Sequence, residues 1–153
     1  MKIKQWLGAG AALSLASGCG VMPFQPAPNE VLAPVRFVGM GSPMMCKDGK
    51  VYSLSAVGNT NVVNVPVGQR IGFGATMRSD GYNVIYTCNA WLGFLPEANR
   101  SYVANSGLAD SGRCFTELVR EDASKDTGVT VEPSVRPLAC AAPAPAPAAS
   151  APR

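Results

Sequence analysis

The sequence contains no histidine among its 153 residues. This absence removes the usual general base, the Ser-His-Asp arrangement and the commonest zinc ligand. The remaining candidates for acid–base catalysis are Glu117, Glu121 and Asp122, but the odd spacing of Glu117 and Asp122 places them on opposite faces of a strand. We interpret the three carboxylates as a solvated strand edge. The sequence therefore predicts that the protein is not an enzyme and carries no cofactor.

An excess of charge of one sign is also missing. The chain has 13 lysine and arginine residues and 10 aspartate and glutamate residues. Lys2 and Lys4 belong to a segment that we expect to be removed, which leaves 11 basic residues against 10 acidic ones. Nucleic-acid-binding proteins concentrate basic side chains in a stripe, with aromatic residues among them. The balanced and dispersed charges predict no nucleic-acid partner.

The apolar run near the N-terminus is too short to cross a membrane. It extends over about eleven residues from Trp6 to Ala16 and follows two lysines, whereas a membrane-spanning helix needs about 20 apolar residues. A basic start, a short apolar run and small residues after it are typical of a signal peptide. We therefore expect residues 1–18 to be a signal peptide.

The end of this segment reads Leu15-Ala16-Ser17-Gly18-Cys19, which resembles the lipobox of bacterial lipoproteins. It differs from the commonest pattern in having Ala16, not leucine, three residues before the cysteine. The resemblance implies cleavage after Gly18 and acylation of Cys19, so that the membrane is a partner through the lipid anchor. In that family an aspartate after the cysteine marks retention in the inner membrane. Gly20 at this position implies the outer membrane, with the domain facing the periplasm.

Proline-rich segments flank the central region on both sides. Residues 19–34 contain the expected lipidated cysteine and four prolines, which favour an extended backbone and predict a tether. Residues 141–153 are almost entirely alanine and proline, a composition typical of a disordered, polyproline-type tail. The region between them, residues 35–140, is predicted to be a single folded domain.

This region has the pattern of a β protein. Apolar residues alternate over several short runs, and Gly, Pro and Asp-Gly turns separate the runs. The pattern predicts a small antiparallel β-sandwich of seven or eight strands, stapled by disulfides. Val63 and Val65 share one face of the run Asn61–Val67, and Ile71, Phe73, Ala75 and Met77 share one face of the run Arg70–Met77. Gly72 and Gly74 fall on the opposite face of the second run, which predicts a bulge or a close approach of another backbone. The main expected strands are Val51–Val57, Asn61–Val67, Arg70–Met77, three runs between Tyr82 and Asp122, and Thr127–Glu132.

Four cysteines remain for disulfides once Cys19 is assigned to the lipid. An even set in a small exported domain favours two bridges, and four cysteines allow three connectivities. We prefer Cys88 with Cys114, because this pair would join the first and last runs of the central meander. Cys46 would then pair with Cys140.

Three aromatic residues suit either core packing or an exposed binding patch. These residues are Trp91, Phe94 and Tyr102. Core packing is favoured because such rings dominate the interiors of small β domains. Tyr102 follows the turn at Pro96 by a few residues and is a candidate corner tyrosine.

Two functions fit these observations. The first is a non-catalytic binding or scaffolding module for another envelope protein, engaged by a strand edge or by loops. The alternative is a lipoprotein that binds a soft metal such as copper, or a small ligand, through the cluster of Met40, Met44, Met45 and Cys46. Thioether and thiolate ligands select Cu(I), so the alternative requires a free thiol at Cys46.

Overall fold

The computed structural model describes residues 21–81 and 84–140, and its regular elements are all β-strands. The predicted all-β class is therefore confirmed. No helix in these residues is long and apolar enough to cross a membrane. The strands are β1 (Met22–Pro23), β2 (Leu32–Gly39), β3 (Ser42–Lys47), β4 (Lys50–Ser53), β5 (Val62–Pro66), β6 (Ile71–Gly81), β7 (Val84–Phe94), β8 (Tyr102–Leu108), β9 (Cys114–Glu121), β10 (Val129–Val131) and β11 (Arg136–Pro137).

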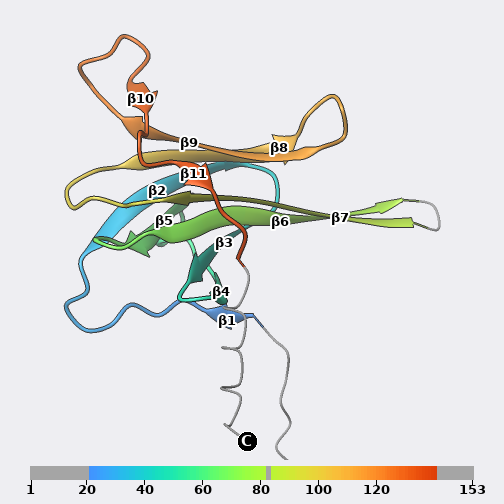
Figure 1. Cartoon of the computed structure of the whole chain (residues 1–153), viewed down its shortest axis with the longest axis horizontal. Coiled ribbons are helices and arrows are strands. Elements are labelled where there is room, and N and C mark those ends of the chain that lie inside the picture. Colours follow the sequence, from blue (N-terminus) through green and yellow to red (C-terminus); the bar gives the residue numbers. More distant parts are fainter. Residues whose placement is uncertain (1–20, 82–83, 141–153) are drawn as a thin grey trace, which may run out of the picture.

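These strands form two sheets (Figure 1). The first has six strands in the order β1-β4-β3-β6-β7-β11, and the second has five in the order β10-β9-β8-β2-β5. Two pairs are parallel, β1 with β4 and β2 with β8. The described residues thus form eleven strands, more than the seven or eight predicted, and their pairing is mixed and not wholly antiparallel. Alternation along a strand reports which face is buried and not which way its neighbour runs, and β1 and β11 are too short to alternate.

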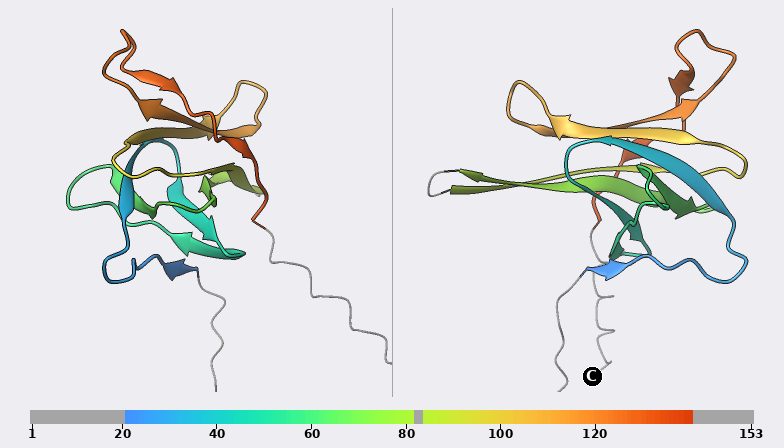
Figure 2. Two further views of the ribbon diagram at one scale, coloured as in Figure 1. Left: turned by 60° about the vertical axis from the view of Figure 1, so that its left-hand side comes forward. Right: turned by 180° about the vertical axis from the view of Figure 1, so that it is seen from behind.

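The two sheets lie one over the other (Figure 2), and the side chains of their inner faces form one hydrophobic core. The period-two pattern places the side chains as predicted: Val63 and Val65 on β5, and Ile71 and Phe73 on β6, are at most 1% exposed. Met77 continues the same face of β6 and is 6% exposed. Burying such a side chain is worth roughly 1.5–3 kcal/mol. The alternating residues therefore fix which face of each strand turns inward.

The segment predicted to be a tether packs against the domain over its described part. The rings of Phe24 and Tyr52 meet edge to face, with 6.1 Å between centroids, and Lys47 Nζ lies 2.9 Å from Glu30 Oε1. Ala33 is completely buried, and β2 begins at Leu32 and not at residue 35. Proline-rich composition indicates an extended backbone, but it does not say whether that backbone is solvated or lies along a sheet. The remainder of the predicted tether, residues 19–20, lies outside the described residues.

Both preferred disulfides are present. Cys88 on β7 is bonded to Cys114 on β9 and so joins the two sheets. Cys46 on β3 is bonded to Cys140, with 5.7 Å between their Cα atoms. This second bridge holds the segment after β11 against the outer face of the first sheet. A Cβ atom at Gly72 would lie 2.9 Å from Cys46 Cβ, and one at Gly74 would collide with the Ala90 carbonyl oxygen. The predicted close approach of another backbone is confirmed at Gly74, whereas at Gly72 the nearest atoms belong to the side chains of Leu138 and Cys46.

Candidate functional site

A two-stranded arm extends sideways from the body of the domain (Figures 1 and 2). It consists of the distal halves of β6 and β7, which pair with each other from Ile71↔Phe94 to Gly81↔Val84. The strand expected at Arg70–Met77 is longer than predicted, because β6 continues through Gly81. On the other side of β6, the pairing with β3 ends at Thr76. On the other side of β7, β11 pairs only with Leu92 and Gly93.

The outer edge of β7 is therefore unpaired by any described strand from Val84 to Trp91. On the β11 side, Arg136 pairs with Gly93, and Pro137, which has no N–H, pairs with Leu92, so Gly93 is the residue whose N–H and C=O point away from β6. In an antiparallel ladder the N–H and C=O of one residue point the same way, and successive residues alternate. Asn89 and Thr87, four and six residues earlier, thus present their N–H and C=O groups at the free edge, whereas those of Ala90 and Cys88 face β6.

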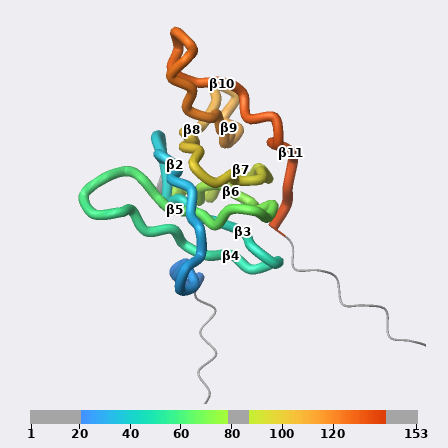
Figure 3. The backbone as a smooth tube through the Cα atoms, turned by 90° about the vertical axis from the view of Figure 1, so that its left-hand side faces the viewer, coloured from blue at the N-terminus to red at the C-terminus, as the bar shows by residue number. Residues whose placement is uncertain are grey.

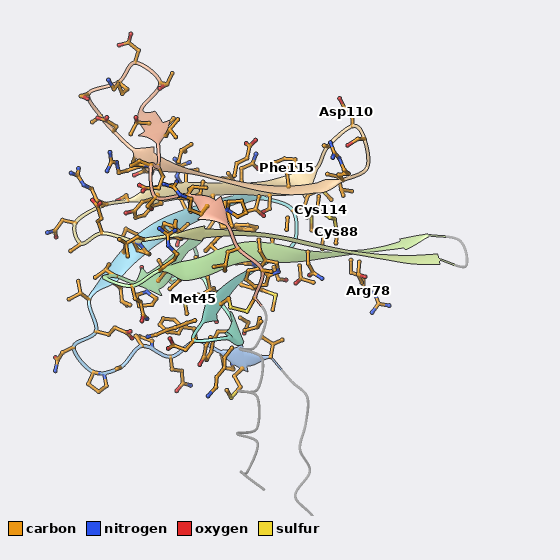
Figure 4. All side chains as sticks on the ribbon, in the orientation of Figure 1. Met45, Arg78, Cys88, Asp110, Cys114 and Phe115 are labelled. Atoms are coloured by element: carbon orange, nitrogen blue, oxygen red, sulfur yellow. A yellow bond between two sulfur atoms is a disulfide. The ribbon has the colours of Figure 1, made fainter. Side chains whose placement is uncertain are left out.

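A cleft of about 320 Å³ lies at the base of the arm. It is bounded on one side by Met77, Thr87 and Cys88 of the arm and on the other by Leu108 and Gly112 of the β8–β9 turn, with Met40 also in its lining. Figure 4 shows Cys88 and Cys114 together between the two layers at this point, with Asp110 at the tip of the β8–β9 turn. Met40 is 56% exposed and Leu108 is 49% exposed. The cleft therefore offers large apolar side chains to a partner.

Backbone contacts fix these apolar side chains in place. The N–H of Met40 donates a 2.8 Å hydrogen bond to the carbonyl oxygen of Ser106. Gly39 has φ of +109°, and a Cβ atom there would collide with that same carbonyl oxygen. Leu108 precedes a turn closed by the N–H of Ala109, which donates to the carbonyl of Arg113 at 2.9 Å. Both exposed side chains are thus presented by ordered turns.

The three candidate carboxylates do not form a catalytic pair. Glu121 lies 3.1 Å from the guanidinium of Arg36. Asp122 Oδ1 accepts hydrogen bonds from Ser124 Oγ at 2.6 Å and from Ser124 N at 3.0 Å. These bonds hold the pKa of Asp122 below its ordinary value. Glu117 is exposed on β9. Glu121 thus forms an ion pair, Asp122 stabilises a turn, and Glu117 lies on the solvated surface of β9.

The residues of the proposed soft-metal cluster do not converge. Cys46 is in a disulfide, and Met45 is completely buried in the core. Met44 points to the opposite face of β3, where its sulfur accepts a hydrogen bond from Thr76 Oγ1 at 2.8 Å. Met40 lies at the cleft. Cys46 therefore does not provide the free thiol that the alternative function requires. Among the described residues, no group of three or more His, Cys, Asp or Glu side chains is placed to hold a metal ion.

The aromatic residues divide between the core and the outer face. Phe94 and Tyr102 are completely buried, with ring centroids 5.2 Å apart. Trp91 is partly buried beside Gly74 on the outer face of the first sheet. The sequence did not predict the arm, because the alternation of apolar and polar residues is the same in a strand within a sheet and in a strand that projects from it. It also did not predict the exposed position of Leu108 at the cleft. The apolar Leu108 just before the polar turn at residues 109–113 was the available signal.

The predictions for the two ends of the chain concern residues outside the described ones. They comprise the cleavage site at Gly18 and Cys19, the lipidation of Cys19, and the tail of residues 141–153. Comparison of the chain with protein-family models, with curated proteins and with solved structures found no match.

Proposed function

We propose that the protein is a lipid-anchored, non-catalytic binding module of the bacterial outer membrane that holds an extended segment of another envelope protein. The observation that carries this proposal is the unpaired edge of β7 beside an apolar cleft. An exposed edge presents a row of N–H and C=O groups that a further strand can pair with. Strand addition takes its affinity from main-chain hydrogen bonds and its specificity from pockets for alternate side chains.

The cleft supplies such a pocket. A strand added along β7 would pass Cys88, and its inward side chains would face Met77 and Leu108. Methionine side chains are flexible and polarisable, so Met40 and Met77 can adapt to apolar side chains of different shape. We therefore expect a partner segment with an apolar residue flanked by residues of high β propensity.

Two further observations support a location in the envelope. The residues up to Cys19 resemble a lipobox, and both disulfides suit an oxidising compartment. Because β1 begins at Met22, a lipid on Cys19 would be only three residues from the folded domain. Three extended residues span roughly 10 Å. The domain would thus sit close to the bilayer surface, and its partner would be found there.

Site-specific crosslinking in whole cells tests this proposal. A photoreactive residue is placed at Thr87, which is exposed at the cleft, and the crosslinked products are identified by mass spectrometry. We expect one recurrent envelope protein, crosslinked through an extended segment. The matched control carries the same photoreactive residue at Val57, which is 48% exposed and lies away from the cleft.

A second pair of variants separates binding at the cleft from general exposure of apolar surface. Leu108→Asp and Val57→Asp alter side chains of nearly equal exposure, 49% and 48%. We expect Leu108→Asp to abolish the crosslink at position 87 and Val57→Asp to leave it unchanged. Equal crosslinking from positions 87 and 57, or full retention of the partner by Leu108→Asp, would contradict the proposal.

A further inference from the structure

Glu132, which follows β10, is a buried carboxylate with one unsatisfied oxygen. The residue is 2% exposed. Its Oε1 accepts a 2.9 Å hydrogen bond from the N–H of Ser134. Its Oε2 is buried and has no hydrogen-bond partner among the described residues. Buried carboxylates are normally paired or fully hydrogen-bonded, because removing a charged oxygen from water is costly.

The chain around Glu132 is held firmly, so the carboxylate is part of a built structure. The N–H of Val135 donates to the Glu132 carbonyl at 3.3 Å and closes a turn. Arg70 donates to the carbonyl of Ser134 at 2.6 Å, and the N–H of Leu95 donates to Ser134 Oγ at 2.9 Å. These bonds come from β-strand ends of the first sheet and fix the turn against it. Turning Glu132 toward solvent would require this network to break.

Glu132 lines a groove of about 450 Å³ between the two sheets. The segment from β10 to β11 runs down this open side of the domain (Figure 3). The other groove residues that matter here are apolar: Trp91 and Leu92 on β7, Leu118 on β9, and Val131 and Val135 on either side of Glu132. A groove with apolar walls and one buried polar atom is the usual form of a small-molecule site.

The charges at the groove favour a cationic ligand. Glu117 adds a second carboxylate to the lining. Arg136 is also present, but its guanidinium donates to the backbone carbonyls of Pro133 and Val135, at 3.0 and 2.6 Å. No described side chain therefore donates to Glu132 Oε2. A ligand with a positively charged donor would supply the missing hydrogen bond as a charge-assisted one.

We infer that this groove is a binding site for a small organic amine, whose ammonium group donates to Glu132 Oε2 while its alkyl part packs between Trp91, Leu118 and Val135. This site is separate from the cleft at the arm and does not depend on the proposed strand addition. An alcohol of the same length would offer a single uncharged donor. A carboxylate of the same length would be repelled by Glu132 and Glu117.

Nuclear magnetic resonance on the mature chain, residues 19–153, tests the inference with n-hexylamine, n-hexanol and n-hexanoate. Trp91 is the one tryptophan of these residues, because Trp6 belongs to the expected signal peptide, so the single indole N–H signal reports on the groove. We expect saturable shifts of the Trp91 signal with hexylamine, weaker binding of hexanol, and no shift with hexanoate. Glu132→Gln should weaken hexylamine binding by roughly tenfold or more.

A second variant keeps the test decisive if Glu132→Gln unfolds the domain. Val131 is 79% exposed, so Val131→Arg leaves the core intact while it places bulk and positive charge at the groove. We expect Val131→Arg to abolish hexylamine binding and Val57→Arg, a control outside the groove, to retain it. Equal binding of hexanol and hexylamine, unchanged affinity in Glu132→Gln or Val131→Arg, or no saturable shift would overturn the inference.

Discussion

The hydroxyl oxygen of Tyr102 accepts a 2.9 Å hydrogen bond from the backbone N–H of Glu97. Tyr102 begins β8 in the second sheet, and Glu97 lies in the connection that leaves β7 of the first sheet. The bond therefore fixes the corner at which the chain passes from one sheet to the other. The tyrosine ring is completely buried against Phe94. The predicted corner role of Tyr102 is confirmed.

Tyr102→Phe should destabilise the domain without changing its fold. The variant keeps the buried ring but leaves the part-buried N–H of Glu97 without its acceptor. Losing one partner of such a bond costs about 1–3 kcal/mol. We expect a decrease of that size in the free energy of unfolding, measured by urea denaturation. Tyr52→Phe, which removes a hydroxyl away from this corner, is the control, and an equal loss in both variants would argue against the corner.

The Cys46–Cys140 disulfide should contribute more stability than Cys88–Cys114. The two bridges span 94 and 26 residues. In the chain-entropy model the longer loop contributes about 4.7 kcal/mol and the shorter one about 3.5 kcal/mol. Cys46→Ala/Cys140→Ala should therefore unfold at lower urea concentration than Cys88→Ala/Cys114→Ala. The reverse order would show that the inter-sheet bridge stabilises the native state by more than loop closure.

The ion pair between Glu30 and Lys47 should make stability depend on acidic pH. The hydrogen bond from Lys47, together with that from the N–H of Ala27, holds the pKa of Glu30 below its ordinary value of 4.5. As the pH falls through 4.5 the unfolded chain takes up a proton at this group before the folded chain does. The stabilisation is thus fully present above that pH and is lost as the pH falls through the lower folded pKa.

Urea unfolding at about pH 7 and about pH 3 measures this effect. We expect Glu30→Gln to reduce the loss of stability between the two pH values. Lys47→Met should do the same, and the double variant should add little, because both changes remove one interaction. Additive effects in the double variant would show that the two side chains act separately.

The sequence was sufficient where burial alternates along a strand. Ile71, Phe73 and Met77 were assigned to one face, and all are buried. The preferred disulfide pairing, one of three possible connectivities, is also the one found, and it was preferred because Cys88 and Cys114 bracket the central meander. These features depend on local period and on order along the chain, which a single sequence records directly.

Features that depend on which strands become neighbours could not be predicted. The parallel pairing of β2 with β8 joins Val35 to Tyr102, residues far apart in the chain. The free edge of β7 exists because β11 pairs only with Leu92 and Gly93, and nothing in the residues of β7 itself records that. Leu108 and Met40 form one wall of the cleft only after β8 and β2 have paired. Glu132 is a single carboxylate after a short strand, and its burial follows from the path of the chain into β11.

Cys19→Ser should prevent lipidation. The resemblance of residues 15–19 to a lipobox predicts a thioether-linked lipid on this sulfur, and one serine substitution removes the acceptor. We expect the variant to lose incorporation of labelled palmitate and to leave the membrane fraction. The Cys46–Cys140 and Cys88–Cys114 bridges should still form, because neither uses Cys19. Unchanged palmitate labelling in Cys19→Ser would refute the assignment of the lipid to this residue.

Gly20→Asp should change the membrane in which the protein resides. Lipoproteins with aspartate after the acylated cysteine commonly stay in the inner membrane, and Gly20 therefore implies transport to the outer one. Separation of the two membranes on a density gradient should find the parent protein in the outer membrane and Gly20→Asp in the inner membrane. Gly20→Asn has nearly the same shape without the charge and is the matched control. If the domain binds its partner close to the outer membrane, Gly20→Asp should also lose the crosslink from Thr87, although the β7 edge is unchanged. Retention of that crosslink in the inner membrane would place the partner within reach of both membranes.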